Sequence, residues 1–279
     1  MKVIKKENPN KGLSFLYKTK FGRIILKPVV KNSIISNISA WFLKSKLSTF
    51  MIKKFVSNNN INMDEYIDVK YKSFNDFFIR DIKPNARKFD YDKNCLCAPC
   101  DSYLTHYEIN DNTFIIKNNE YNIKSLLQDD ELANKYNNGD MLVFRLAPNN
   151  YHHYYYPFSG KLIKKYKIKG KFHSVNPVVY DNFKVFIENT REISVLDANN
   201  YGTVTYIEVG ALLVGKIKNI DKKTFKTGEE KGYFEYGGST IILLFEKNKI
   251  SINDKIRNTS IKNYELSVKL GEKIVKKRD

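Results

Sequence analysis

The stretch YFEYGGSTIILLF, residues 233–245, places two glycines and a serine directly before an uninterrupted run of apolar residues. The run Ser239–Phe245 is rich in β-branched and apolar residues and predicts a buried strand. Gly237 and Gly238 predict a turn, which is what Gly-Gly before a strand most often forms. Because Gly238 has no side chain, its carbonyl is open to close approach by the hydroxyl of Ser239, one residue downstream. The stretch therefore combines a core strand with a peptide bond that a neighbouring hydroxyl could attack.

Strand-like runs extend from this stretch back to about residue 95. They are rich in Val, Ile, Tyr and Phe and are separated by Gly, Asn and Asp turns, a pattern typical of β-structure. There is no long alternation of strand and helix, which argues against a doubly wound parallel sheet. One short helix, Ile123–Leu127, is predicted to interrupt the strands. The other predicted strands are Thr113–Lys117, Met141–Leu146, Gly160–Ile168, Lys184–Glu188, Val204–Val209 and Leu212–Ile217.

The segment from Leu13 to Asn58 predicts amphipathic helices. Apolar residues recur at three- and four-residue spacing with basic residues outside the stripe, and the first stretch is expected to end near Pro28. The helices either pack on the core or lie at a membrane surface, where basic flanks and apolar faces suit the headgroup boundary. Both can hold for different faces. The apolar positions are Phe15, Leu16, Ile24, Ile25, Leu26, Ile34, Ile38, Trp41, Phe42, Leu47, Phe50, Met51 and Phe55.

These patterns predict an α+β fold, with N-terminal amphipathic helices followed by a β-rich core. We divide the chain into a helical region, residues 1–58, and a core, residues 59–279. Residues 59–72 are polar and predict a connection, after which Ser73 and Asp76 mark the start of a short helix over 74–82 that Pro84 ends. The lysine-rich end after Lys269 is predicted to be a solvated tail.

The charge of the chain favours anionic partners. It holds 48 lysines and arginines against 30 acidic residues, a net charge of +18 over 279 residues. Such a field attracts nucleic acid, acidic proteins or anionic membranes. The aromatic residues lie in strand patterns and are not interleaved with arginine, so no nucleic-acid-binding module is recognised. No apolar run reaches the about 18 residues of a membrane-spanning helix, and residues 1–11 do not resemble a secretory signal.

Cys95, Cys97 and Cys100 form one cluster. Structural zinc takes four ligands, usually in two separated pairs, and no second Cys or His pair follows at finger spacing. We therefore expect no metal site. In a chain without a secretory signal, the three thiols are expected to be reduced.

The chain has only four histidines, which makes each of them informative. His152 and His153 are adjacent in a tyrosine-rich segment, Asn150–Pro157. If this segment is a strand, the two side chains point to opposite faces, and one could face a site. His106 and His173 are isolated, and for an isolated histidine a structural role is the more common one.

Several blocks together resemble the phosphatidylserine decarboxylase family. The segment Tyr233–Thr240 is similar to the family's processing segment, in which a small hydrophobic residue or glycine precedes Gly-Ser-Thr. The blocks occur in family order across residues 74–240, so that motifs of moderate specificity become strong together. The others are Phe74–Arg80 with Lys83-Pro84, Ala98–Ser102, Arg145–Pro148 with Tyr151-His152, Val175–Pro177, Glu188–Arg191 and Val209–Gly215.

The resemblance implies a self-cleaving proenzyme with a β-rich catalytic core. Ser239 attacks the Gly238 carbonyl, the resulting ester undergoes β-elimination, and position 239 becomes a pyruvoyl group with loss of ammonia. That group forms a Schiff base with phosphatidylserine and is the electron sink for its decarboxylation to phosphatidylethanolamine, without metal or pyridoxal phosphate. Cleavage yields a β chain, 1–238, and an α chain, 239–279, which stay associated because Ser239 begins a core strand.

The family's self-cleavage uses an Asp-His-Ser relay, which the resemblance carries onto Asp101 and Ser239 but leaves open at the histidine. Many members have Tyr-His-Arg-x-His, and here Tyr155 stands at the second histidine. Tyrosine, with a pKa of about 10, is a poor base at neutral pH. Either His152 serves both steps, or His153 substitutes after a local shift, or Tyr155 only packs. We favour His152, because it matches a family position and neutral imidazole is a suitable base. His153 falls where the family has Arg and is expected to be solvated or to face a phosphate.

The resemblance also implies partners and a location. These are phosphatidylserine, an anionic membrane surface, a peripheral place on the cytoplasmic side of the cell membrane, and no nucleic acid; a homo-oligomer is left open. Three alternatives remain. A pyruvoyl decarboxylase of a soluble amino acid is disfavoured by the membrane-suited N-terminus. An inactive anionic-lipid-binding relative is made conceivable by Tyr155. A basic nucleic-acid-binding β domain has no motif to support it.

Overall fold

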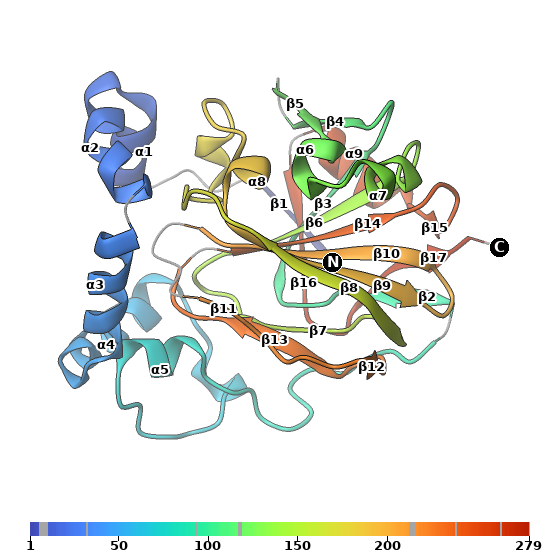
Figure 1. Ribbon diagram of the computed structural model, residues 1–279. Coiled ribbons are helices and arrows are strands. Elements are labelled where there is room, and N and C mark those ends of the chain that lie inside the picture. Colours follow the sequence, from blue (N-terminus) through green and yellow to red (C-terminus); the bar gives the residue numbers. More distant parts are fainter. Residues whose placement is uncertain are drawn as a thin grey trace.

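The computed structural model describes residues 1–5, 11–31, 33–92, 94–116, 119–211, 216–237, 239–262 and 264–278. The α+β prediction is confirmed: the helices α1 to α5 lie beside one end of a large antiparallel sheet (Figure 1). Gly238 and most of the predicted strand Leu212–Ile217 fall outside the described residues.

The elements are as follows. The helices are α1 Lys11–Lys18, α2 Lys20–Lys31, α3 Ser33–Lys44, α4 Phe50–Asn58, α5 Phe74–Phe78, α6 Ile123–Leu127, α7 Asp130–Lys135, α8 Val185–Glu188 and α9 Asp254–Ile261. The strands are β1 Lys2–Lys5, β2 Cys95–Cys97, β3 Ser102–Glu108, β4 Thr113–Ile116, β5 Asn119–Asn122, β6 Asp140–Leu146, β7 His153–Tyr155, β8 Gly160–Ile168, β9 Arg191–Ala198, β10 Gly202–Val209, β11 Ile217–Asn219, β12 Thr224–Phe225, β13 Glu230–Phe234, β14 Ser239–Phe245, β15 Ile250–Ser251, β16 Tyr264–Val268 and β17 Lys273–Lys277.

The predicted strand Ser239–Phe245 is β14, and it occupies the middle of the main sheet. Among the described residues this sheet has the order β1-β16-β3-β6-β14-β10-β9-β8-β12. All seven side chains of β14 are buried. Ile241 and Leu243 pack into the hydrophobic core on one face, and Ile242 and Leu244 pack into the core on the other, as the two-residue period of a strand requires. Ser239 thus begins a strand that is covered on both faces.

The N-terminal helices bury one side against the core. Tyr17, Leu26 and Val30 join the hydrophobic cluster on one face of the sheet. The prediction that the first helical stretch ends near Pro28 is wrong, since α2 continues to Lys31. Proline removes one backbone hydrogen bond, but Leu26 and Val30 on either side of it are buried, and this packing holds the helix.

Two other segments differ from the predictions. Lys184–Glu188 was expected to be a strand, but α8 occupies it. Arg191 Nη1 donates to the carbonyls of Ile187 and Asn189 at 2.8 and 2.9 Å, which satisfies acceptors at the end of this helix. The short helix expected over 74–82 ends at Phe78.

The segment after Lys269 is not a solvated tail. It contains β17, which pairs with β15 and β2 in a second, three-stranded sheet. Ile274 and Val275 of this strand are buried, so two apolar residues among the lysines are enough to anchor it. β11, β13 and β7 form a further three-stranded sheet, which carries His153 and the approach to Ser239.

Candidate active site

Two of the predicted site residues meet at the start of β14. Ser239 Oγ lies 3.4 Å from Nδ1 of His152, and both side chains are fully buried. Nε2 of His152 lies 3.1 Å from the carbonyl oxygen of Ala147. Because a carbonyl only accepts, this contact assigns the imidazole proton to Nε2. Nδ1 is then the acceptor that faces the serine hydroxyl, which is the tautomer a base requires.

A tight turn after β6 fixes this imidazole. Ala147 N donates to Asn150 Oδ1 at 2.7 Å, and Asn150 N donates to the Ala147 carbonyl at 2.9 Å. On its other side, the ring packs against Phe78 of α5 with a centroid distance of 4.2 Å. His152 is therefore held by one sequence block and covered by another, some 70 residues earlier in the chain.

The environment of His152 keeps it neutral. Burial is the main cause that lowers its pKa from 6.5 to about 3, and the charge of Arg80 acts in the same direction. The Ala147 carbonyl and the Asp101 carboxylate oppose this shift with smaller effects. The neutral imidazole is the form that can accept a proton from a hydroxyl.

The residues that lead to the Gly238–Ser239 bond are held by α5. Tyr236 N donates to Asn75 Oδ1 at 3.2 Å. The Tyr236 ring meets Phe74 and Phe78 edge to face, each at 5.0 Å. Gly237 has φ +139°, a conformation that side chains disfavour. Contacts with α5 therefore hold the residue Tyr236, upstream of the Gly238–Ser239 bond, and the strand β14 begins directly after the bond.

A contact from α3 reaches the same segment. Lys44 Nζ lies 2.9 Å from Oε1 of Glu235, a residue that is 5% exposed and stands three positions before Gly238. This ion pair links an N-terminal helix to the residues around the predicted cleavage site.

Asp101 lies at the centre of an ion-pair network. Its carboxylate accepts from Arg87 Nε at 2.9 Å and Nη2 at 2.6 Å, from Lys269 Nζ at 3.2 Å and from Leu270 N at 2.8 Å. Burial raises its pKa, but the hydrogen bond from Arg87 and the charges of Lys269 and Arg87 lower it overall. No hydrogen bond joins Asp101 to His152 among the described residues. Its place in a relay stays a prediction, and the sequence did not reveal Arg87, Lys269 or Leu270 as its partners.

His153 is engaged on both sides of its ring. Nδ1 lies 2.8 Å from Glu230 Oε1, and Nε2 lies 3.0 Å from the Ile79 carbonyl. The ring stacks on Tyr151 at 4.6 Å. The expectation that His153 is solvated or faces a phosphate is wrong, because one step along the chain turns it away from His152 into this buried sheet.

Tyr155 has the surroundings of a packing residue. Burial raises its pKa above the ordinary 10, so the phenolate, the form that could accept a proton, is still scarcer at neutral pH. Its hydroxyl lies 3.5 Å from that of Tyr151, and its ring packs on Phe89 at 5.7 Å. Of the three candidates left open by the sequence, His152 has the contact to Ser239.

The cysteines show no sign of a metal site. Cys97 and Cys100 are buried, and burial raises the pKa of Cys97 to about 11, so its thiol stays protonated. Within the residues that the structure describes, no group of three or more His, Cys, Asp or Glu side chains could hold a metal ion.

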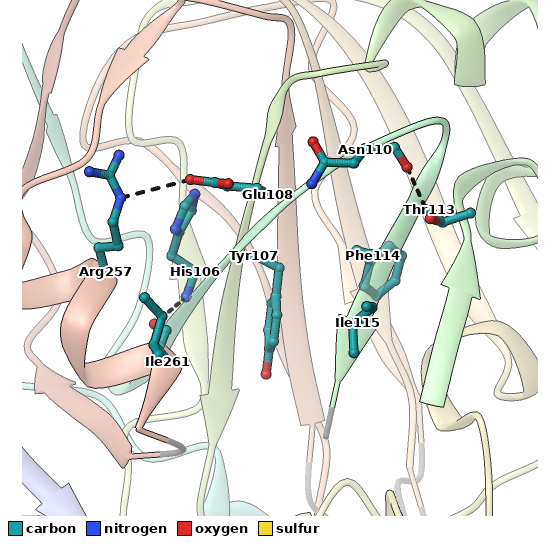
Figure 2. Close-up of a pocket in the computed structure, with 10 residues that line it drawn as sticks. His106, Tyr107, Glu108, Asn110, Thr113, Phe114, Ile115, Arg257 and Ile261 are labelled. Carbon is teal, nitrogen blue, oxygen red and sulfur yellow. Dashed lines mark hydrogen bonds and ion pairs between the residues drawn. The ribbon is translucent and has the colours of Figure 1, made fainter. Parts of the chain in front are cut away.

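A separate cavity of about 340 Å³ lies between β3, β4 and α9 (Figure 2). His106 lines it, and its Nε2 lies 2.7 Å from Asp140 Oδ1 while its backbone N donates to Ser260 Oγ. Neither Ser239 nor His152 lines this cavity. His106 therefore has the structural surroundings expected of an isolated histidine.

Comparisons with known proteins agree with these features. The chain matches the family model described as phosphatidylserine decarboxylase over residues 74–276. The phosphatidylserine decarboxylase proenzyme 2 of Clostridium acetobutylicum is 44% identical over 275 residues, which cover 98% of this chain and 94% of the relative. The phosphatidylserine decarboxylase proenzyme of Clostridium tetani is 42% identical, with 98% and 94% covered. That of Fusobacterium nucleatum is 39% identical, with 94% and 90% covered.

Proposed function

Because this chain belongs to the phosphatidylserine decarboxylase family, we propose that it matures by cutting itself between Gly238 and Ser239, with His152 as the base. Its activity is that of a carboxy-lyase that converts phosphatidylserine to phosphatidylethanolamine. The observation that carries the proposal is the 3.4 Å contact between Ser239 Oγ and the unprotonated Nδ1 of a buried, neutral His152. This contact also speaks against an inactive lipid-binding relative.

In the proposed cleavage, His152 Nδ1 accepts the hydroxyl proton of Ser239 as Oγ bonds to the Gly238 carbonyl carbon. The C–N bond to residue 239 then breaks and the nitrogen takes up a proton, which leaves an ester. Removal of the α-proton of residue 239 breaks its Cβ–Oγ bond and releases the upstream chain as a carboxylate. Water replaces the nitrogen as ammonia leaves, so that atoms and charges balance.

Position 239 suits the pyruvoyl group that this sequence of steps would make. Ser239 is fully buried and is the first residue of β14. It pairs with Leu146 of β6, and the next residue, Thr240, pairs with Val209 of β10. These two pairings fix the backbone at position 239. A pyruvoyl group supplies an electron sink for the charge left when CO2 departs. Phe78 covers the ring of His152 and Tyr236 packs on Phe78. His152 remains beside position 239 to hold or return a proton.

We expect the rate of self-cleavage to stay nearly constant as the pH is lowered from about 8 to about 5. The pKa of His152 lies at about 3, so the base form persists through this range. A histidine with an ordinary pKa of about 6.5 would lose more than about tenfold in rate by pH 5. The measurement is the initial rate at which the 239–279 fragment appears in freshly synthesised proenzyme.

The same shift has a consequence for stability. The folded-state pKa of His152 is below its unfolded value. The stability that the protein has with a neutral His152 is therefore fully present above about pH 6.5 and is lost as the pH falls toward 3. Circular dichroism at each pH shows whether the proenzyme is still folded. A tenfold fall in cleavage rate centred near pH 6.5, with the fold intact, would point to a solvated base instead of His152.

The N-terminal helices support a further part of the proposal, a peripheral place on the anionic, cytoplasmic face of the membrane. They expose large apolar side chains and carry lysines at the same time. None of the described helices is long and apolar enough to cross a bilayer. Because exposed apolar side chains next to lysines suit the headgroup boundary, we propose that these helices lie on the membrane surface. A soluble amino-acid substrate would not require this apolar surface. The exposed residues are Phe15, Phe21, Ile24, Ile25, Ile38, Trp41, Leu47 and Phe50.

A chain carrying Trp41→Asp and Phe50→Asp is expected to bind phosphatidylserine-containing vesicles at least about a hundredfold more weakly than the wild type. Each side chain is more than 70% exposed, and burying such a residue in lipid contributes about 1.5–3 kcal/mol. Co-sedimentation with vesicles measures the binding. Ile163→Asp, at an apolar position on β8 that is 57% exposed, is the control and should bind normally. Equal binding by all three chains would rule out this membrane-facing surface.

A further inference from the structure

We propose that a cavity between α2 and the segment 171–183 binds the phosphate of an anionic glycerophospholipid, at a place separate from the reacting serine. The cavity has a volume of about 370 Å³, which is within the range of ligand sites. This inference goes beyond the proposed function, and it uses the membrane proposal only as the source of the lipid. Its test requires neither cleavage nor decarboxylation.

Three basic side chains line the cavity: Arg23, Lys27 and Lys171. None of the described residues that line it is acidic. Glu188 stands nearby, with Oε2 2.7 Å from Lys171 Nζ, while Arg23 donates to neutral oxygens of Tyr17 and Asn182 at 3.2 and 3.4 Å. Three cations beside one carboxylate leave a surplus of positive charge, which a phosphate would balance.

A buried histidine faces the same cavity. His173 lines it and is 4% exposed. Its Nε2 faces Glu188 Oε2 at 3.6 Å, and this contact is the largest cause that lowers the pKa of Glu188 to about 2. Nδ1 has no hydrogen-bond partner among the described residues. Buried ring nitrogens usually have partners. Beside three cations, Nδ1 can donate to an oxygen acceptor of a ligand when it carries the imidazole proton.

The remaining wall is apolar. Leu26 and Val30 of α2 and Phe183 on the opposite side complete the lining. Residues 23, 26, 27 and 30 follow the three- and four-residue spacing of one helix face, so α2 presents two cations and two apolar side chains together. Leu26 and Val30 are themselves buried, but Phe183 is partly exposed. A free phosphate would leave Phe183 uncovered, whereas a glycerophospholipid covers it with its glycerol and the start of an acyl chain.

Leu26 and Val30 dock this face of α2 on the core, and Tyr17 docks the preceding helix, α1, beside it. Tyr17 is fully buried, its hydroxyl accepts from Ser174 N at 2.9 Å, and its ring meets Phe183 edge to face at 5.7 Å. Ile24 of α2 is 69% exposed on the outside of the helix. The cavity therefore borders the surface that we propose to lie on the membrane, where lipid headgroups are at hand.

The cavity is also close to the catalytic end of the sheet. Asn189 Nδ2 donates to the carbonyls of His173 and Gly210, each at 2.8 Å. Gly210 directly follows Val209, which pairs with Thr240, the neighbour of Ser239. A lipid held here would fix the membrane-facing helix against the strand end that carries the reactive residue.

The test measures binding of dihexanoyl phosphatidylglycerol, a lipid that is not the substrate, to the uncleaved Ser239→Ala chain by calorimetry. The lipid is kept below its micelle concentration, so that membrane surface charge does not contribute. We expect saturable binding, weakened about tenfold or more by Lys27→Ala with Lys171→Ala, because two charge-assisted contacts are lost. Lys18→Ala with Lys20→Ala removes the same charge from exposed positions of α1 and the start of α2 and is expected to leave binding within about twofold.

Two further arms separate lipid from free phosphate. Inorganic phosphate is expected to bind far more weakly than the lipid, and Phe183→Ala is expected to weaken lipid binding without changing phosphate binding. Thermal unfolding of each variant shows that it is folded. The proposal is overturned if the lipid does not bind, if both double variants bind alike, or if phosphate binds as tightly as the lipid. Since Ser239→Ala cannot be processed, none of these outcomes depends on the cleavage proposal.

Discussion

A chain in which His152 is replaced by alanine is expected to cleave itself at least about a hundredfold more slowly than the wild type. A positioned base contributes about 10²–10⁴ to a rate, and Nδ1 of His152 is the acceptor that Ser239 Oγ meets at 3.4 Å. His153 cannot replace it without breaking its contacts to Glu230 and Ile79. The rate is measured as the appearance of the 239–279 fragment on denaturing gels.

Two companion variants make this experiment decisive. His153→Gln removes the neighbouring imidazole and is expected to cleave within several-fold of the wild type. Adding Tyr155→His to the His152→Ala chain is expected to restore nothing, because the Tyr155 side chain packs on Phe89 and Tyr151. Thermal unfolding shows whether each chain is folded. Wild-type cleavage in a folded His152→Ala chain would remove His152 from the mechanism.

The second large effect concerns Asp101. Its replacement by alanine is expected to lower the free energy of unfolding by about 3–5 kcal/mol, the usual result of leaving a buried ion-pair partner alone. Among the described carboxylates Arg87 would keep Glu65 alone, and the backbone N of Leu270 would lose its acceptor. Urea unfolding measures the loss, in the Ser239→Ala background, where the chain remains one polypeptide and unfolding is unimolecular.

The pH dependence of this contribution has a defined sign. Because the folded-state pKa of Asp101 is lowered, its stabilisation is present above the unfolded pKa of about 3.9 and is lost as the pH falls further.

The control for Asp101→Ala is Asp197→Ala. This variant breaks an exposed ion pair between Asp197 and Lys161, whose charged atoms lie 3.3 Å apart, and it is expected to lower the free energy of unfolding by at most about 1 kcal/mol. Equal losses in the two variants would show that Asp101 is not the centre of a buried network.

The strands that sequence predicted well are those whose signal is local. Ser239–Phe245 and Gly160–Ile168 match β14 and β8, because continuous or alternating apolar residues between turn residues suffice to define a strand. The helix Ile123–Leu127 was equally well marked and matches α6. The sequence was enough to predict a segment where its own residue pattern and its packing in the fold favour the same secondary structure.

The wrong secondary-structure predictions concern segments whose conformation depends on contacts with residues far away in the sequence. Lys184–Glu188 has a composition typical of a strand but is helical, and Arg191 caps its carbonyls while also donating to Leu126 O. The C-terminal segment looked solvated because its three apolar residues are few, yet Lys269 and Leu270 reach Asp101, 168 and 169 residues earlier. Neither contact has a local signature.

The candidate site shows the same division. The bond at Gly238–Ser239 and the importance of His152 followed from motifs, whereas the choice between His152 and His153 needed the structure. Adjacent residues on a strand must face opposite ways, but which one meets Ser239 depends on Glu230 and Ile79, more than 70 residues from His153. The tautomer of His152 likewise depends on the Ala147 carbonyl.

The central claim is that the chain cuts itself after Gly238 and converts residue 239. Intact-mass spectrometry of the purified wild-type protein tests it most directly. The account predicts two chains, 1–238 and 239–279, the smaller lighter by one ammonia than an unmodified serine-started chain, and a single uncut chain for Ser239→Ala. A wild-type protein that stays one chain of 279 residues under native conditions, or is cut elsewhere, would contradict it.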